Sequence, residues 1–177
     1  RGHSKSSYLN KNLLSINLKK VKMKKLTFML FCFIVTATAA SAQTSNQLLE
    51  KNRNFTGAVA SQKHYHAIYQ LDTNDPKTIE KTIRNINNAL TDPRLQGKVE
   101  IELIAYSGGT DAYLKNGKYE NDLKSLVEKV VIVAQCSNTL RERKLTRNDI
   151  YDFIGVVPSG NGELIIREAQ GWAIVKP

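Results

Sequence analysis

The chain has 177 residues and a formal net charge of +10, from 26 Lys and Arg against 16 Asp and Glu. Eight of the basic residues and none of the acidic ones precede Gln43, so eighteen basic and sixteen acidic side chains leave the rest of the chain at only +2. Because the excess positive charge lies in the leader, the rest of the chain lacks the strong positive charge that would favour binding to nucleic acid. The roughly 135 residues that follow are enough for one domain with a hydrophobic core.

The leader has the features of an export signal. Met23-Lys24-Lys25 is a short basic start, an apolar stretch follows over residues 26–35, and small residues end at Ala40-Ser41-Ala42. This pattern predicts a secretory signal peptide over residues 23–42, cleaved after Ala42. The apolar stretch is shorter than the roughly 20 residues of a membrane span. We therefore expect export across the inner membrane to the periplasm, with no membrane attachment after cleavage, and we treat residues 1–22 as an upstream extension outside the fold.

The rest of the chain alternates predicted strands and helices. Residues 43–63 are polar and predict a flexible lead-in, followed by a single domain over residues 64–177. Strands are predicted over residues 65–71, 99–106, 130–134, 155–157 and 172–175. Helices are predicted from Pro76 to the Asp92-Pro93 stop and over residues 119–127, 139–144 and 163–170, with a short helical turn over 111–115. This alternation predicts an α/β three-layer sandwich: a mostly parallel five-stranded sheet with helices on both faces.

Two segments give the most specific structural expectations. Asp75-Pro76 provides a helix cap and a proline in the first turn, and Ile79, Ile83 and Ile86 recur at helical spacing, so this helix has one buried face. The run over residues 130–134 has no polar alternation. A strand of this kind must be covered on both faces, so we expect it to be central in the sheet.

Several polar residues follow the predicted strands directly. Because the carboxyl ends of parallel strands meet at one edge of a sheet, their following loops form a binding crevice there. We therefore predict a pocket at this edge, lined by residues from three loops. Its candidate binding residues are Asp72, Ser107, Gly108, Gly109, Ser137 and Asn138, and the candidate catalytic residue is Cys136.

Cys136 is the one cysteine that remains after signal cleavage. It ends an apolar run and precedes a predicted helix, whose free backbone N–H groups favour a thiolate over a thiol. Arg141 and Arg143 follow on that helix and would add positive potential if they turned back towards the sulfur. The alternative interpretation is a small buried side chain, because free cysteine is among the most buried residue types. The residues alone leave both interpretations open.

Other candidate sites are weaker. His64 and His66 would share one face of a strand, but no third ligand accompanies them, so no metal site is predicted. Gly160-Asn161-Gly162 before a helix lacks the long preceding strand and third glycine of a dinucleotide-binding loop, and a turn that caps a helix explains it better. No cofactor is predicted.

The chain resembles the DsrE/DsrF-like family. The resemblance covers roughly residues 64–177 and implies a small α/β fold that forms homo-oligomers, in which a cysteine at the position of Cys136 carries sulfur as a persulfide between partners. The cysteine segment is more similar to an uncharacterised branch, and Lys129 stands where the family usually has glycine before the third strand. The segments that carry the resemblance are His66 with Leu71-Asp72, residues 84–88, 102–109, 136–140, 157–160 and 170–177.

Together these observations predict an exported, DsrE-like protein that binds or relays sulfur on Cys136, sulfurtransferase-like if it is an enzyme. The expected partners are a second copy of the chain, in dimer or trimer units, and a sulfur donor or acceptor, either a protein or a small thiol. The alternative is a non-catalytic homo-oligomeric module that binds a small ligand or a partner and contains a buried structural cysteine.

Overall fold

The computed structural model describes residues 43–177. The chain divides into two units, residues 1–58 and 59–177. The predicted signal peptide over 23–42 and the extension over 1–22 lie outside the described residues. In the first unit, residues 43–53 are helical, where the sequence predicted only a flexible lead-in. Within the described part of the chain, no helix is both long and apolar enough to cross a membrane.

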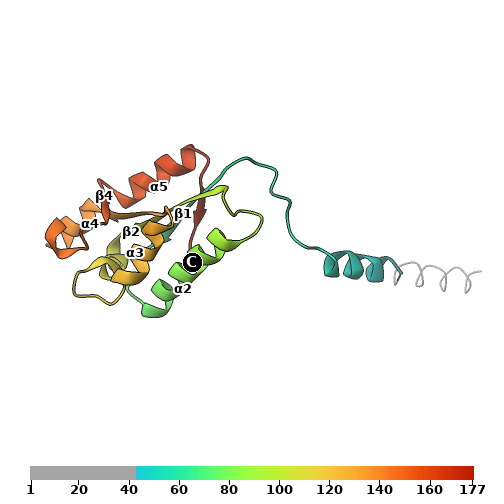
Figure 1. The fold of residues 1–177 in the computed structure, drawn as a ribbon, viewed down its shortest axis with the longest axis horizontal. Helices are drawn as coiled ribbons and strands as arrows, with labels where there is room; N and C mark the ends of the chain where they lie inside the picture. Colours follow the sequence, from blue (N-terminus) through green and yellow to red (C-terminus); the bar gives the residue numbers. More distant parts are fainter. Residues whose placement is uncertain (1–42) are drawn as a thin grey trace, which may run out of the picture. The chain divides into compact units, whose positions relative to one another are not determined.

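The second unit is built from a five-stranded sheet and its connecting helices (Figure 1). The strands are β1 (Tyr65–Leu71), β2 (Val99–Ala105), β3 (Ile132–Cys136), β4 (Gly155–Val157) and β5 (Ala173–Val175). The α-helices are α2 (Pro76–Thr91), α3 (Glu120–Glu128), α4 (Ser137–Glu142) and α5 (Gly160–Ala169). Two 3₁₀ helices, η1 (Ser107–Tyr113) and η2 (Arg147–Asp149), complete the elements.

The strand order is β4-β3-β2-β1-β5, and every pairing is parallel. The predicted α/β sandwich with a five-stranded sheet is thus confirmed. The central strand, however, is β2, and the strand expected over residues 130–134 begins only at Ile132 and lies second from one edge. The strand is interior, with core residues on both faces as expected, but it is not central. Its predicted start was two residues early because Val130 follows the end of α3. Two helices also begin earlier than predicted: α4 begins at Ser137 and not at 139, and α5 begins at Gly160 and not at 163.

Helix ends explain where β3 begins. Val130 has a left-handed φ of 67°, its N–H donates to the carbonyl of Val127, and the N–H of Val131 donates to the carbonyl of Leu126. This is the Schellman motif, in which the left-handed position is usually glycine. α5 ends in the same way on Gly171, with φ 85°. Val130 is apolar and β-branched, which is typical of strands, so the sequence predicted the start of a strand where α3 ends.

The sheet has unequal cover on its two faces. The chain steps from β1 to β2, β3 and β4 in one direction, and right-handed crossovers place all three connections on one face. The return from β4 to β5 places α5 on the other face (Figure 1). The buried side chains agree: Leu123 and Leu140 belong to the larger core, and Leu164 of α5 to a smaller one with Ile68 and Ile104.

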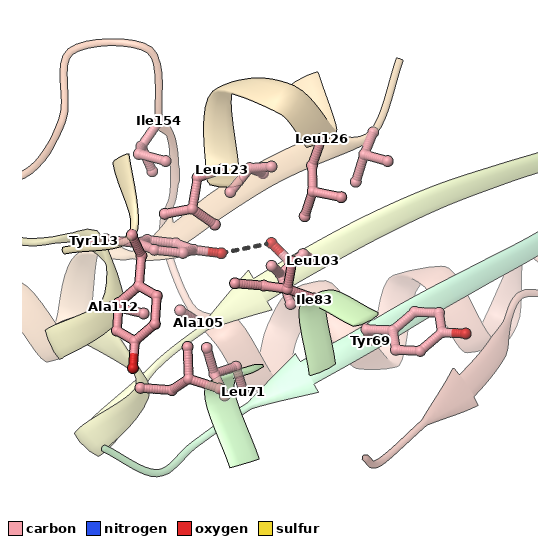
Figure 2. Close-up of a cluster of buried hydrophobic side chains, with 14 of the residues drawn as sticks. Tyr69, Leu71, Ile83, Leu103, Ala105, Ala112, Tyr113, Leu123, Leu126 and Ile154 are labelled. Atoms are coloured by element: carbon pink, nitrogen blue, oxygen red, sulfur yellow. Dashed lines mark hydrogen bonds between the residues drawn. The ribbon is translucent and has the colours of Figure 1, made fainter. Parts of the chain in front are cut away.

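The larger core lies between the sheet and the helices α2 and α3 (Figure 2). Ile79, Ile83 and Ile86 of α2 are buried in it, as their spacing predicted. The Tyr113 hydroxyl donates a hydrogen bond of 3.1 Å to the carbonyl of Leu103, so this phenol is satisfied inside the core.

An ion pair with a buried carboxylate joins β2 to α5. The Glu102 side chain is 1% exposed and accepts from Arg167 at 2.8 Å from Nε and 2.7 Å from Nη2. Arg167 also binds Glu163 at 3.0 Å, and its guanidinium lies 4.1 Å from the ring centroid of Trp172. Burial raises the pKa of the Glu102 carboxyl, and the charge of Arg167 opposes that rise. Arg167 therefore compensates a carboxylate that water barely reaches.

Candidate functional site

Cys136 is the last residue of β3 and the N-cap of α4. Side chains alternate along a strand, and Ala134, two residues earlier, belongs to the core under α5, so the Cys136 side chain lies on the α5 face. Its thiol is free and the residue is 5% exposed. It belongs to neither apolar core, although it is buried.

The sulfur of Cys136 is surrounded by hydrogen-bond donors. Burial raises the pKa of the thiol, but hydrogen bonds from the Thr139 hydroxyl and from the backbone N–H groups of Thr139, Gly160 and Asn138 lower it by more. The pKa therefore lies below that of an ordinary cysteine. The donors come from the first turns of two helices, α4 and α5, which meet at one atom. Such an arrangement stabilises a negative charge on sulfur.

Thr139 connects the sulfur to the neighbouring loop. Thr139 is 5% exposed, and its hydroxyl oxygen accepts a hydrogen bond of 3.1 Å from the backbone N–H of Ser107. The hydroxyl proton is then left for the sulfur of Cys136. Ser107 itself has a left-handed φ of 50°, so a constrained backbone holds the donor that orients Thr139.

The two glycines of the predicted pocket bring neighbouring loops together. A Cβ on Gly109 would lie 2.0 Å from the carbonyl oxygen of Leu71, and one on Gly108 would lie 3.0 Å from the backbone nitrogen of Asn74. The N–H of Gly108 also donates 3.2 Å to the carbonyl of Asp72. The loop that follows β2 thus rests directly on the turn that follows β1, and only glycine permits that approach.

The Asp72 side chain forms a second part of this edge. It binds Lys176 at 3.0 Å, and the pair lies near Tyr106, whose hydroxyl donates 3.2 Å to Gln70. Burial raises the pKa of the Tyr106 phenol, and the negative charge of Asp72 raises it further. The Tyr106 ring also packs against Gly160, where a Cβ would lie 3.0 Å from the ring.

The structure therefore brings the candidate residues to one edge of the sheet in two groups. The backbone N–H of Asn138 lowers the pKa of Cys136 directly, and the N–H of Ser107 binds the Thr139 hydroxyl that also lowers it. Asp72 makes its contacts with Lys176. Ser137 begins α4 and is half-buried. A pocket enclosed by these residues stays a prediction.

Among solved structures, the protein of unknown function MTH1491 from Methanobacterium thermoautotrophicum is 31% identical to this chain, with a TM-score of 0.61, over 64% of this chain and 99% of that one. The chain belongs to the family of MTH1491. The conserved protein of unknown function BT1422 from Bacteroides thetaiotaomicron covers 68% of this chain and 100% of its own, at 10% identity and a TM-score of 0.52. That likeness shows the fold alone. No family model and no curated protein matches the chain.

Membership of the MTH1491 family supports the fold. Because MTH1491 has no known function, any inference about chemistry rests on the residues described above. Neither Thr139 nor Gly160 was predicted from the sequence to lie at the sulfur of Cys136. Gly160-Asn161-Gly162 was interpreted as a turn that caps a helix, but these residues are themselves the first turn of α5. Its cap is Ser159, whose hydroxyl accepts 3.2 Å from the N–H of Gly162. That this cap would face Cys136 depends on the crossover of α5, which no local pattern encodes.

Arg141 of α4 and Arg143, which caps its C-terminal end, make their hydrogen bonds away from the sulfur. Arg141 donates to the side chain of Asn138, and Arg143 donates to the carboxylate of Asp111 and to the carbonyl of Ser107. Neither charge is among the causes of the lowered pKa of Cys136. Dipolar groups, and not these two cations, lower the pKa of the thiol.

The histidines predicted to share a face lie at the opposite end of β1. His66 stacks on Trp172 with ring centroids 5.2 Å apart, and its Nε2 lies 3.6 Å from Glu100. Within residues 43–177, no group of three His, Cys, Asp or Glu side chains is placed to hold a metal ion.

Proposed function

We propose that the protein is DsrE-like and carries sulfane sulfur as a persulfide on Cys136. The observation that supports this is the set of donors around the sulfur, from the Thr139 hydroxyl and the first turns of two helices. A thiolate, not a thiol, is the nucleophile in sulfur chemistry. The resemblance of the whole domain to the DsrE-like family, in which a cysteine at the position of Cys136 carries sulfur, supports the same chemistry.

The proposed step is a transfer from a donor persulfide. The Cys136 thiolate attacks the outer sulfur of the donor, and a new S–S bond forms at Cys136. The S–S bond of the donor breaks, and its electron pair leaves with the donor thiolate. The proton of the outer sulfur stays on it or is exchanged with water, so no oxidant or reductant is consumed.

Release of the sulfur requires an external acceptor. Cys136 is the one free cysteine among the described residues, so no second thiol there can displace the bound sulfur within the same chain. The acceptor is then a small thiol or a partner protein. Because the residue is 5% exposed, we expect small, unbranched donors to react faster than bulky ones.

The proposal includes export. The basic start at Met23, the apolar stretch after it and the small residues ending at Ala42 support a signal peptide, and the mature protein would act in the periplasm. Cell fractionation with N-terminal sequencing of the exported product tests this. A protein retained in the cytoplasm with its leader intact would contradict export without affecting the sulfur chemistry.

A mass measurement tests the sulfur chemistry. After incubation with a small persulfide donor, the peptide that contains Cys136 should gain about 32 Da per bound sulfur. The Cys136→Ser variant should gain none in that peptide. Persulfide on other peptides only, or none at all, would contradict the proposal.

The alternative is a binding module in which Cys136 is structural. The low exposure of the residue favours it. Under this alternative the thiol is inert in the folded protein, and Cys136→Ser retains ligand or partner binding.

A further inference from the structure

The backbone of Ser107 is bound on both sides by residues one helical turn apart. Thr139 lies in α4 and Arg143 caps that helix four positions later, so their side chains lie on the same side of it. The Thr139 hydroxyl oxygen accepts from the N–H of Ser107 at 3.1 Å, and Nη1 of Arg143 donates to the Ser107 carbonyl at 3.2 Å. The segment that follows Cys136 therefore binds both backbone polar groups of Ser107.

The conformation of Ser107 needs this support. Its φ of 50° lies in the left-handed region, which is unfavourable for a residue with a Cβ. Such a conformation persists only where the surrounding structure fixes it. Ser107 is exposed, so apolar packing does not hold it. The hydrogen bonds with Thr139 and Arg143 fix the backbone on either side of its Cα.

Arg143 is in turn held by Asp111. Its Nη2 donates to Oδ1 of Asp111, and Oδ2 of the same carboxylate accepts from the Asn74 side chain at 3.2 Å. Arginine can bind Asp111 and the Ser107 carbonyl at once because its guanidinium is a rigid, planar fork of donors. The side chains of Arg143 and Asp111 are 34% and 32% exposed, and an ion pair this accessible to water contributes little to stability. We therefore expect variants of either residue to fold.

We propose that Arg143 is a positioning residue for Cys136: together with Asp111 it holds Ser107 in the conformation that leaves the Thr139 proton for the sulfur. A hydroxyl has one proton, and an N–H bound to its oxygen leaves that proton for another acceptor. Without Arg143 the backbone of Ser107 relaxes, its N–H turns away, and the Thr139 hydroxyl can rotate. The sulfur then loses a donor. This inference rests on the proposed thiolate chemistry of Cys136, and it gives the charge of Arg143 no direct effect on the sulfur.

Titration of the Cys136 thiol tests this role, because a charge effect and a positioning effect have opposite signs at Asp111. Asp111→Ala deletes a negative charge, which by electrostatics alone would increase the thiolate fraction. We expect instead a decrease of about three- to tenfold at neutral pH, as for the loss of one hydrogen bond, and a similar decrease in Arg143→Met. Arg143→Lys keeps the charge without the fork and should not restore the wild-type fraction. The control is Arg141→Met, which removes an equal charge from the same helix and should titrate like the wild type.

A second substitution should reverse the effect. Glycine adopts a left-handed φ without strain, so adding Ser107→Gly to Arg143→Met should recover part of the lost thiolate fraction. A lost charge would not be compensated in this way, and its effect would disappear in about 1 M salt, where the Debye length is about 3 Å. We expect the effect of Arg143→Met to persist there. Faster amide hydrogen exchange at Ser107 in Arg143→Met gives an independent measurement.

The thiolate is measured by its ultraviolet absorbance, as the difference between each chain and its Cys136→Ser counterpart in a Cys32→Ser background. An unchanged titration in Arg143→Met and Asp111→Ala, an increased thiolate fraction in Asp111→Ala, or full recovery in Arg143→Lys would overturn the proposal. Circular dichroism and thermal melting establish that each variant folds, and if Arg143→Met does not, Asp111→Ala provides the same test. The titrations need no sulfur donor, so this proposal can fail while persulfide forms on Cys136, and it can hold while none forms.

Discussion

Gly160, in the first turn of α5, is one of the groups whose hydrogen bonding lowers the pKa of Cys136 at the end of β3. A Cβ at position 160 would lie 3.0 Å from the ring of Tyr106, so any larger residue would press on that ring where α5 begins. The donors of α4 come from residues next to the cysteine in the sequence, whereas this one arrives from the following crossover. The polar environment of the sulfur is therefore a property of the fold and not of the cysteine segment alone.

Removal of the Thr139 hydroxyl should raise the pKa of Cys136. Thr139→Val keeps the shape of the side chain but deletes the donor that contributes most to lowering that pKa. We expect a smaller thiolate fraction at neutral pH, measured by the pH dependence of thiolate absorbance in the ultraviolet. The matched control is Thr82→Val, since Thr82 is also buried and donates its hydroxyl to a backbone carbonyl elsewhere. An unchanged titration in Thr139→Val would show that the hydroxyl does not stabilise the thiolate.

Gly109→Ala should severely destabilise the fold. The added Cβ would lie 2.0 Å from the carbonyl oxygen of Leu71, a backbone atom at the end of β1 that cannot move aside easily. We expect a loss of more than about 4 kcal/mol in the free energy of unfolding, measured in urea. Gly155→Ala is the control, because its Cβ would first meet an atom at 3.4 Å and should cost less than about 1 kcal/mol. A mild effect at Gly109 would contradict the close approach of the two loops.

Val130→Gly should stabilise the protein. Val130 holds a left-handed φ of 67° and is 83% exposed, so glycine relieves strain and removes little buried surface. Left-handed geometry costs a β-branched residue about 1–2 kcal/mol, and the greater flexibility of unfolded glycine offsets part of the gain. We expect a net gain of about 1 kcal/mol in the free energy of unfolding. The reverse change at the equivalent position, Gly171→Val, should destabilise by a similar amount; a loss on Val130→Gly would mean that the motif is absent.

Arg167→Met should destabilise the protein in a pH-dependent way. It leaves the Glu102 carboxylate buried without its partner, at a cost of about 3–5 kcal/mol near neutral pH. The folded-state pKa of Glu102 is already raised by burial and should rise further without Arg167. An acid with a raised folded pKa binds its proton more tightly in the folded state, so stability increases as the pH falls through that pKa.

The deficit of Arg167→Met relative to wild type should therefore shrink between neutral and mildly acidic pH, measured by urea unfolding at each pH. Arg94→Met removes an exposed partner of Asp92 and is the control, for which we expect less than about 1 kcal/mol. A deficit in Arg167→Met that does not change with pH would show that Glu102 is not the group responsible.

Local patterns predicted those features whose cause is local. The isoleucines of α2 recur at helical spacing and are buried, and the junction of β3 with α4 at Cys136 follows from an apolar run that meets a polar segment. The misplaced central strand shows the limit of that approach. Val130 and Val131 have the same side chain, but one ends α3 in a left-handed conformation and the other packs in the larger core. Backbone hydrogen bonds decide between them, and side-chain type does not report those bonds.

The candidate site divides in the same way. Asn138 is close to Cys136 in the sequence and could be proposed from it. Gly160 and the pairing of Ser107 with Thr139 could not, because they depend on where two crossovers bring their loops. Arg141 and Arg143 would have added positive potential if they had turned back towards the sulfur, yet Arg143 binds Asp111. Long side chains on a short helix have several partners within reach, and sequence spacing does not select among them.

The central claim is that Cys136 reacts as a thiolate in the folded protein. The most direct measurement is the rate of alkylation of the Cys136 peptide by a small reagent, followed by mass spectrometry at increasing urea concentrations below the unfolding transition. We predict a rate that hardly depends on urea, because the sulfur reacts from the native state or after a small local opening. A rate that rises with the full denaturant dependence of global unfolding would contradict the claim and make Cys136 a structural residue.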